Sequence, residues 1–403
     1  MNTGFYLKSL VRFTGLAVLW LAGVAGAQEQ QTGLCAPVQI QILQKLTLER
    51  VGFLATLTIA DNSGNNPITG FAANLTFENP QLSTNGVNDS SSLFFVQPPT
   101  FQNISDVNGS GVIQPGQTAT ISWFIIPTTG AGGTTPNGVQ FNVGAKLSGQ
   151  VNGVAIPAAD FQVIPASITV TPDAQLQITY FTPRDTIGID PFTQQGSPIP
   201  FTFGVLVQNV GYGPAQSVII NSQQPKITGN VQNLPLVAQL LGTRVDDSAL
   251  SNANLTINVG DLNPGQTAKG AWDMITTFSG TFQSVSATYS HSTALGGQET
   301  SLIKSVNAYL FSHEVLDDSP GRDNIRDFLA DTSGTLDVLN NLIPDSLYES
   351  DGGVFPVNYL TNAVVAGGGN PVQVNLTANV SGWGYLRVND PGQAKLPVFS
   401  VVR

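Results

Sequence analysis

Apolar and polar positions alternate along two stretches that lie far apart in the chain. The segment 53–59 is apolar at every second residue and ends at an Asp-Asn-Ser-Gly turn, 61–64. The segment 201–207 alternates in the same way and ends at an Asn-Val-Gly turn, 209–211. A period of two residues that stops at an Asn/Gly turn is typical of a half-buried β-strand entering a hairpin. The pattern therefore predicts the same strand and turn twice.

A second pair of repeats follows downstream. Pro-Gly-Gln-Thr-Ala occurs at 115–119 and at 264–268, and Trp123 and Trp272 each lie eight residues after the proline. Pro-Gly favours a tight turn, and Thr-Ala then begins a strand. We interpret both tryptophans as core residues; an exposed platform for a ligand is the alternative.

The order of elements is the same in both copies, and the repeat period of about 150 residues is far longer than that of a solenoid, so each copy should be a domain. About seven short strands separated by turns predict an immunoglobulin-like β-sandwich. We place the two sandwiches at 28–172 and 173–312. The 42 Gly, 25 Pro and only 10% charged residues agree with an all-β chain.

Two stretches of the second copy match a known module: Val-Leu-Val-Gln-Asn-Val-Gly at 205–211 and Leu-Asn-Pro-Gly-Gln-Thr at 262–267. The first copy matches more loosely, at 57–61 and 113–118. The pattern resembles the CARDB module, a "cell adhesion related domain found in bacteria". This resemblance implies immunoglobulin-like sandwiches on a secreted or surface protein of a bacterium, and it brings no shared catalytic residue.

The N-terminal segment 1–27 has the pattern of a signal peptide. Lys8 and Arg12 precede an apolar run, 13–24, and Ala25-Gly-Ala27 supplies small residues at a cleavage site. The alternative is an uncleaved anchor, but the run is short for a membrane span, and no other stretch approaches the ~20 apolar residues that a span requires. We expect a secreted or cell-surface protein, with the periplasm as the alternative, and no integral span after cleavage.

The net charge limits the classes of possible partner, and the cysteine content limits the covalent links that the chain can form. The net charge is −11 and the mature chain has no basic run, which argues against nucleic acid and anionic membranes. Cys35 is the only cysteine, so no internal disulfide can form. We interpret Cys35 as a small buried side chain; lipid modification is the alternative, although the preceding Leu34 is large for that signal.

The composition changes at 313–351, which holds ten of the 26 acidic residues. Ser319-Pro320 favours a helix start. Apolar residues then recur with helical spacing in 325–329 and 336–343, before Pro344. The pattern predicts an acidic connector of two short amphipathic helices.

The acidic connector also raises the possibility of calcium. Five aspartates offer hard oxygen ligands in an exported protein: Asp317, Asp318, Asp323, Asp327 and Asp331. Their spacing does not match the EF-hand loop. The alternative is capping and ion pairing with Arg322 and Arg326.

The last segment, 352–403, returns to a β pattern and predicts a small C-terminal β-unit that docks on the second sandwich. Trp383, Tyr385 and Arg387 lie two residues apart and would share one face of a strand. They are our candidate carbohydrate-binding residues. The alternative is a core tryptophan beside a tyrosine and a rim arginine.

The residues give little support for catalysis, and we name no catalytic residue. The chain has two histidines, His291 and His313, and too few imidazole and thiol groups for a typical zinc site. Two carboxylates brought together by the fold remain an alternative; Asp273, next to Trp272, is the one to examine. We expect a secreted, non-enzymatic structural or adhesion-type protein with an extracellular protein or glycan as partner. The alternative is a carbohydrate-binding module or a glycan-active enzyme that uses the C-terminal aromatic strand.

Overall fold

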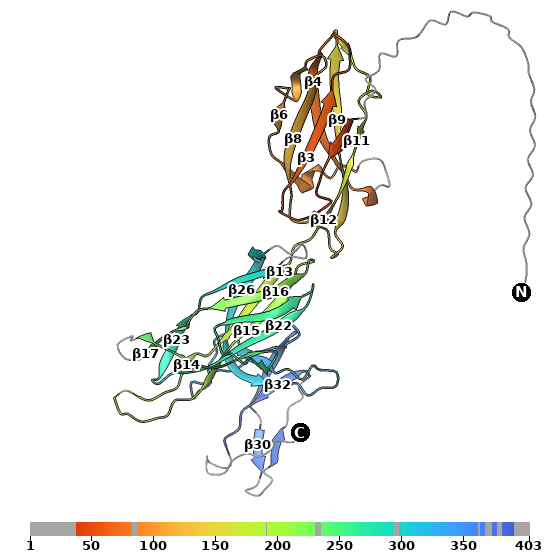
Figure 1. Ribbon diagram of the computed structural model, residues 1–403. Helices are drawn as coiled ribbons and strands as arrows, with labels where there is room; N and C mark the ends of the chain where they lie inside the picture. The colour runs from red at the N-terminus through yellow and green to blue at the C-terminus, as the bar shows by residue number, and fades with distance from the viewer. Residues whose placement is uncertain are drawn as a thin grey trace, which may run out of the picture.

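The computed structural model describes residues 38–82, 88–190, 192–229, 235–292, 298–300, 302–361, 363–366, 373–376 and 381–390. The chain forms two bodies that meet end to end near residues 171–175 (Figure 1). Within the described ranges the regular elements are β-strands and two short 3-10 turns, Pro80–Leu82 and Ser91–Leu93, with no α-helix. The predicted signal peptide and Cys35 lie outside the described residues.

The first domain is a sandwich of two sheets, ordered β11-β1-β3-β8-β5 with β6 on β8, and β2-β12-β9-β4-β7 with β10 on β9. The strands are β1 (Val38–Gln41), β2 (Leu46–Leu48), β3 (Phe53–Ala60), β4 (Ile68–Glu78), β5 (Phe94–Val96), β6 (Thr100–Gln102), β7 (Asn108–Ile113), β8 (Thr118–Pro127), β9 (Val139–Val151), β10 (Val154–Ala155), β11 (Val163–Ile164) and β12 (Ala166–Thr171). With β1, β3, β8 and β5 as strands A, B, E and D, and β4, β9 and β12 as C, F and G, this is the immunoglobulin-like arrangement.

The second domain repeats most of this order. One sheet contains β20-β19-β22-β15-β13-β26, and β21-β16-β24-β25 and β14-β23-β17-β18 form two smaller sheets. The strands are β13 (Gln175–Thr182), β14 (Asp185–Thr186), β15 (Phe201–Asn209), β16 (Ala215–Ser222), β17 (Lys226–Gly229), β18 (Pro235–Leu236), β19 (Gln239–Val245), β20 (Ser248–Ala249), β21 (Thr256–Leu262), β22 (Thr267–Ile275), β23 (Gly280–Ser284), β24 (Ala287–Ser292), β25 (Gln298–Thr300) and β26 (Leu302–Val315).

The alternating segments form the strands that their pattern predicts. Inward-facing residues of β3, such as Leu57, are buried, and so are those of β15, such as Val205. Trp123 is 3% exposed and Trp272 is 0% exposed, which confirms that both are core residues. Apolar burial on one face of each strand provides the main driving force for the sandwich.

Pro-Gly-Gln is a corner between two sheets in both domains. It joins β7 to β8 and β21 to β22, and in each case the two strands belong to different sheets. Gly116 N donates to Asp61 O at 3.0 Å, and Gly265 N donates to Asn209 O at 2.7 Å. Both glycines have a positive φ, +71° and +82°, which glycine adopts without strain. The repeated motif is thus an element of the fold.

The two domains differ in their last strand. In the first, β12 pairs antiparallel with β9. In the second, β26 instead pairs in parallel with β13 and so joins the other sheet. This strand has 14 residues, and its end, from Leu310 to Val315, pairs with β27. The second domain therefore continues into further strands.

Strands replace the predicted helical connector, 313–351, and that prediction was wrong: β27 (Asp327–Asp331) and β28 (Ser346–Tyr348) lie in this segment. With β29 (Val354–Leu360) and β32 (Trp383–Leu386), which follow it, they extend the sheet of β26 in that order. The strands β30 (Ala363–Ala366) and β31 (Gln373–Leu376) form a separate hairpin. We call β27, β28, β29 and β32 the third layer.

The third layer packs on the outer face of the second domain. Phe328 stacks on Phe181 with ring centroids 4.4 Å apart. Its ring also lies against Gly204, where a Cβ would come within 2.4 Å of it. All five residues of β27 are buried, because both faces of the strand are covered. Apolar residues on both faces of a short strand imitate helical spacing, which is why the sequence suggested a helix.

Candidate functional site

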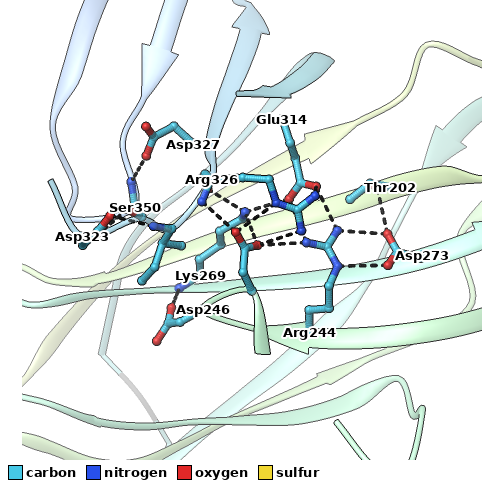
Figure 2. A network of polar contacts seen from close by, with 12 residues as sticks. Thr202, Arg244, Asp246, Lys269, Asp273, Glu314, Asp323, Arg326, Asp327 and Ser350 are labelled. Atoms are coloured by element: carbon cyan, nitrogen blue, oxygen red, sulfur yellow. Dashed lines mark hydrogen bonds and ion pairs between the residues drawn. The ribbon is translucent and has the colours of Figure 1, made fainter. Parts of the chain in front are cut away.

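A dense cluster of charged side chains lies between the second domain and the third layer (Figure 2). Lys269 of β22 is 1% exposed. Its Nζ lies 2.9 Å from Asp247 Oδ1 and 2.7 Å from Glu314 Oε1, and it donates to the backbone oxygen of Arg326 at 2.6 Å. The same ammonium lies 4.7 Å from the centre of the Phe328 ring. Lys269 is therefore fully engaged by groups from three separate parts of the chain.

Two arginines complete this charge network. Arg244 donates to both carboxylate oxygens of Asp273, each at 3.0 Å, and to both of Glu314, at 3.1 and 3.0 Å. Arg326 Nε donates to Asp247 Oδ2 at 3.0 Å, and its Nη1 lies 3.0 Å from Glu314 Oε2. Three cations thus face three carboxylates, which is the pairing that buried charge requires.

The environment keeps Asp247 and Asp273 ionised. Burial alone would raise the pKa of Asp247, but hydrogen bonds from the Arg326 backbone and from Lys269 outweigh burial and lower that pKa to about 2. For Asp273 burial is also outweighed, by hydrogen bonds from Arg244 and Thr202, so its pKa is lowered. A general acid needs a raised pKa, so the chemistry of Asp273 is that of an ion-pair partner.

The candidate calcium ligands fall into two places. Asp317, Asp323 and Asp327 lie around Arg322: Asp317 Oδ2 is 3.1 Å from Arg322 Nε, and Asp323 and Asp327 accept hydrogen bonds from Ser350. Glu349 and Asp351 pair with the same arginine, at 3.0 and 2.9 Å. The Arg322 guanidinium therefore occupies the point at which these acidic side chains converge.

The other two aspartates lie apart from this group. Asp331 ends β27 and accepts hydrogen bonds from the backbone N–H groups of Ser333 and Gly334, so it caps a turn. Asp318 is exposed. In the part of the chain that the structure describes, no three carboxylate, imidazole or thiol groups are arranged to hold a metal ion. Calcium binding stays a prediction.

Two of the three candidate carbohydrate-binding residues line the same cavity, of about 290 Å³. Trp383 and Tyr385 lie on β32, which runs parallel to β29 and pairs Tyr385 with Tyr359. The rings of these two tyrosines stack at 6.0 Å. Arg387 is not among the lining residues; its Nη1 is 3.5 Å from Asp337 Oδ2.

Sequence reasoning missed the charge network around Lys269. Its members come from β19 and the turn that follows it, β22, β26 and the residue that precedes β27, so no local spacing connects them. One signal was available: Lys269 and Asp273 lie two positions either side of Ala271, on the face of β22 opposite Trp272. That signal does not reveal that a third layer covers this face.

Comparisons with known proteins add little to this picture. No protein-family model matches the chain, and no curated protein matches its sequence. Within the described residues no helix is long and apolar enough to span a bilayer. A match to a solved type II cohesin dyad from the adaptor ScaA scaffoldin of Acetivibrio cellulolyticus has 9% identity and a TM-score of 0.18, and covers 68% of this chain and 97% of that one.

Two further solved structures are similar at the same distance. BcpA, the major pilin subunit of Bacillus cereus, has 8% identity and a TM-score of 0.22, with 65% of this chain and 62% of that one covered. The periplasmic chaperone SfaE has 10% identity and a TM-score of 0.18, with 65% and 99% covered. These low scores carry no argument about function, and no family membership is shown.

Proposed function

We propose that this chain is a secreted, non-enzymatic structural or adhesion-type protein, whose β-sandwiches present their surfaces to an extracellular protein or glycan. The observation that carries the proposal is that the charged residues around Lys269 form ion pairs within the fold. The buried ions around Lys269 pair with one another and fix a third layer on the second sandwich. Each of the six side chains, Arg244, Asp247, Lys269, Asp273, Glu314 and Arg326, is held by an opposite charge, and such pairing does not suit them to act as acid, base or nucleophile on a substrate.

The junction between the two sandwiches supports a structural role. The backbone of Pro172 lies between glycines of the two domains: a Cβ on Gly132 would be 2.2 Å from Pro172 N, and one on Gly213 would be 2.0 Å from Pro172 O. Contacts this close hold the linker against both domains. A protein that bridges or spaces partners benefits from such a fixed orientation, because less conformational freedom is lost on binding.

The CARDB resemblance and the signal-peptide pattern support the same proposal and favour a location outside the cytoplasm. The decisive experiment is binding of the purified mature chain to a glycan array and to immobilised extracellular proteins, with hydrolysis of the same glycans assayed in parallel. Saturable binding without turnover is the expected result. Hydrolysis of any glycan would overturn the non-enzymatic proposal.

The second candidate function is carbohydrate binding at the third layer. It is favoured by one observation, the cavity that Trp383 and Tyr385 line, since aromatic rings are suited to stacking on sugars. The test compares the wild type with Trp383→Ala on the same array. Loss of glycan signals in the variant supports this candidate, and unchanged signals refute it.

A further inference from the structure

The outer face of the third layer is apolar: Leu329 and Leu347 on it are buried, and the exposed part of the face lies on β29 and around the cavity. Cross-strand partners share a face, and Leu329 pairs with Leu347, which pairs with Phe355. Val357 continues the same face on β29 and is the partner of Trp383. Phe355 is 41% exposed on this face. The cavity of about 290 Å³ lies here, lined by Leu329, Leu347, Val357 and Trp383.

The segment that follows this face in the chain begins with a third Pro-Gly-Gln sequence. Pro391-Gly-Gln393 comes directly after Asp390, and Phe399 lies eight residues after the proline. Trp123 and Trp272 lie at the same distance from their prolines. In both domains the corner carries the chain from one sheet to the layer that faces it, and the aromatic residue is then buried between the layers.

We propose that residues 391–403 dock on the outer face of the third layer as an extended strand and place apolar side chains in the cavity beside Trp383. Leu396, Val398, Phe399 and Val401 supply the apolar surface. Ten extended residues reach ~33 Å, whereas the four strands of the layer span ~15 Å at their usual spacing. The segment is therefore long enough to cross the whole face.

Charge favours the same occupant. Lys395 and Arg403 flank the apolar run of this segment. Asp317, which pairs with Arg322, contributes to the lining of the cavity, and the exposed Asp318 follows it in the chain. A cationic segment beside Asp318 is complementary in charge, which fixes orientation more than affinity. The proposal does not rest on the adhesive function; a glycan or a second copy of the chain would compete for the same face.

Engineered cysteines test the docking directly. In a Cys35→Ser background, Val357→Cys is combined with cysteine at Leu396, Phe399 or Val401 in turn. Asn358→Cys is the matched control, because its side chain is on the opposite face of β29. We expect an intramolecular disulfide with position 357 for at least one partner and none with 358. No disulfide in any pair, equal yield with 358, or a linked dimer would overturn the proposal.

Trp383 fluorescence provides a second readout. Removal of residues 391–403 should make Trp383 more accessible to acrylamide and shift its emission to the red, and the same changes should be absent when Trp383→Phe carries the deletion. Glycan signals that rise only on deletion would show that the segment blocks the face. Unchanged quenching and emission in the shortened chain would refute docking, whatever its binding properties.

Discussion

Lys269 carries the sharpest prediction for the second domain. Lys269→Met keeps the apolar stem and removes the ammonium, which leaves Asp247 and Glu314 without the cation 2.9 and 2.7 Å away. Removing one member of a buried ion pair costs ~3–5 kcal/mol. Both carboxylates keep arginine partners, so we expect the lower end, about 3 kcal/mol of unfolding free energy.

The assay is urea unfolding followed by the fluorescence of Trp272, which lies on the same strand as Lys269. Trp123→Phe and Trp383→Phe in the background remove the signals of the other described tryptophans. With a slope of ~1–3 kcal/mol per molar urea, the midpoint should fall by about 1 M or more. Lys226→Met is the matched control, because Lys226 lies exposed on β17, and such surface changes stay within ~0.5 kcal/mol.

A double-mutant cycle makes the test stricter. Glu314→Gln alone leaves three cations against two carboxylates, whereas adding it to Lys269→Met restores two against two. The double variant should therefore lose less stability than the sum of the single variants, by ~0.5–3 kcal/mol. If Lys269→Met costs no more than Lys226→Met, or if the two changes are additive, Lys269 does not anchor the third layer.

Three further predictions concern acid, the second acidic cluster and the junction. The pKa of Asp247 is lowered to about 2 from 3.8. Its ion pairs should therefore contribute about 2 kcal/mol to the unfolding free energy above pH ~4, and this contribution should be lost as the pH falls through ~2. An unfolding free energy of the second domain that stays constant over this range would contradict the ion pairs described for Asp247. Burial raises the pKa of Glu349 and of Asp327 even though Arg322 lies beside them. Arg322→Met should therefore destabilise the second domain by ~3–5 kcal/mol at pH 7. The stability of this variant should recover as the pH falls toward 5, which thermal melts at the two pH values would show. A Ca²⁺-dependent rise in the wild-type melting temperature, abolished by Asp327→Asn, would instead favour the calcium hypothesis. The new Cβ of Gly213→Ala should clash with Pro172 O and lower the unfolding free energy by ~1–3 kcal/mol. The variant should also broaden the distance distribution in small-angle scattering. Gly242→Ala is the control and should show neither effect, because its Cβ would meet only Asp273 Oδ2, at 3.8 Å.

The features predicted correctly from the sequence are those that depend on residues close together in the chain. The alternation of β3 and β15, the turns that end them and the buried Trp123 and Trp272 all depend on neighbours within a few residues, and all are as expected. The pairing of β26 could not be predicted from local pattern. This last strand of the second domain pairs with β13, far away in the chain, whereas its counterpart β12 in the first domain pairs with β9.

The connector failed for a related reason. Phe328 and Leu329 are adjacent apolar residues, which suit one side of a helix as well as the two covered faces of a strand. The choice depends on Gly204, whose missing Cβ makes room for the Phe328 ring. The candidate site shows the same limit: Trp383 and Tyr385 were found by spacing along one strand, but their cavity needs Leu329 and Leu347 from two others.

Comparison of the two copies explains where the second domain acquired its buried charge. The residues five and nine positions after the corner proline are Thr120 and Phe124 in the first domain, and Lys269 and Asp273 in the second. On β8 no further layer of the described residues covers this face, and Phe124 is 40% exposed there. On β22 the same face is covered, and its charged residues pair with Arg244, Glu314 and Arg326. An unpaired ion at either position would be costly once the third layer is in place, so the exchange of β26 and the ion pairs stabilise the domain only together.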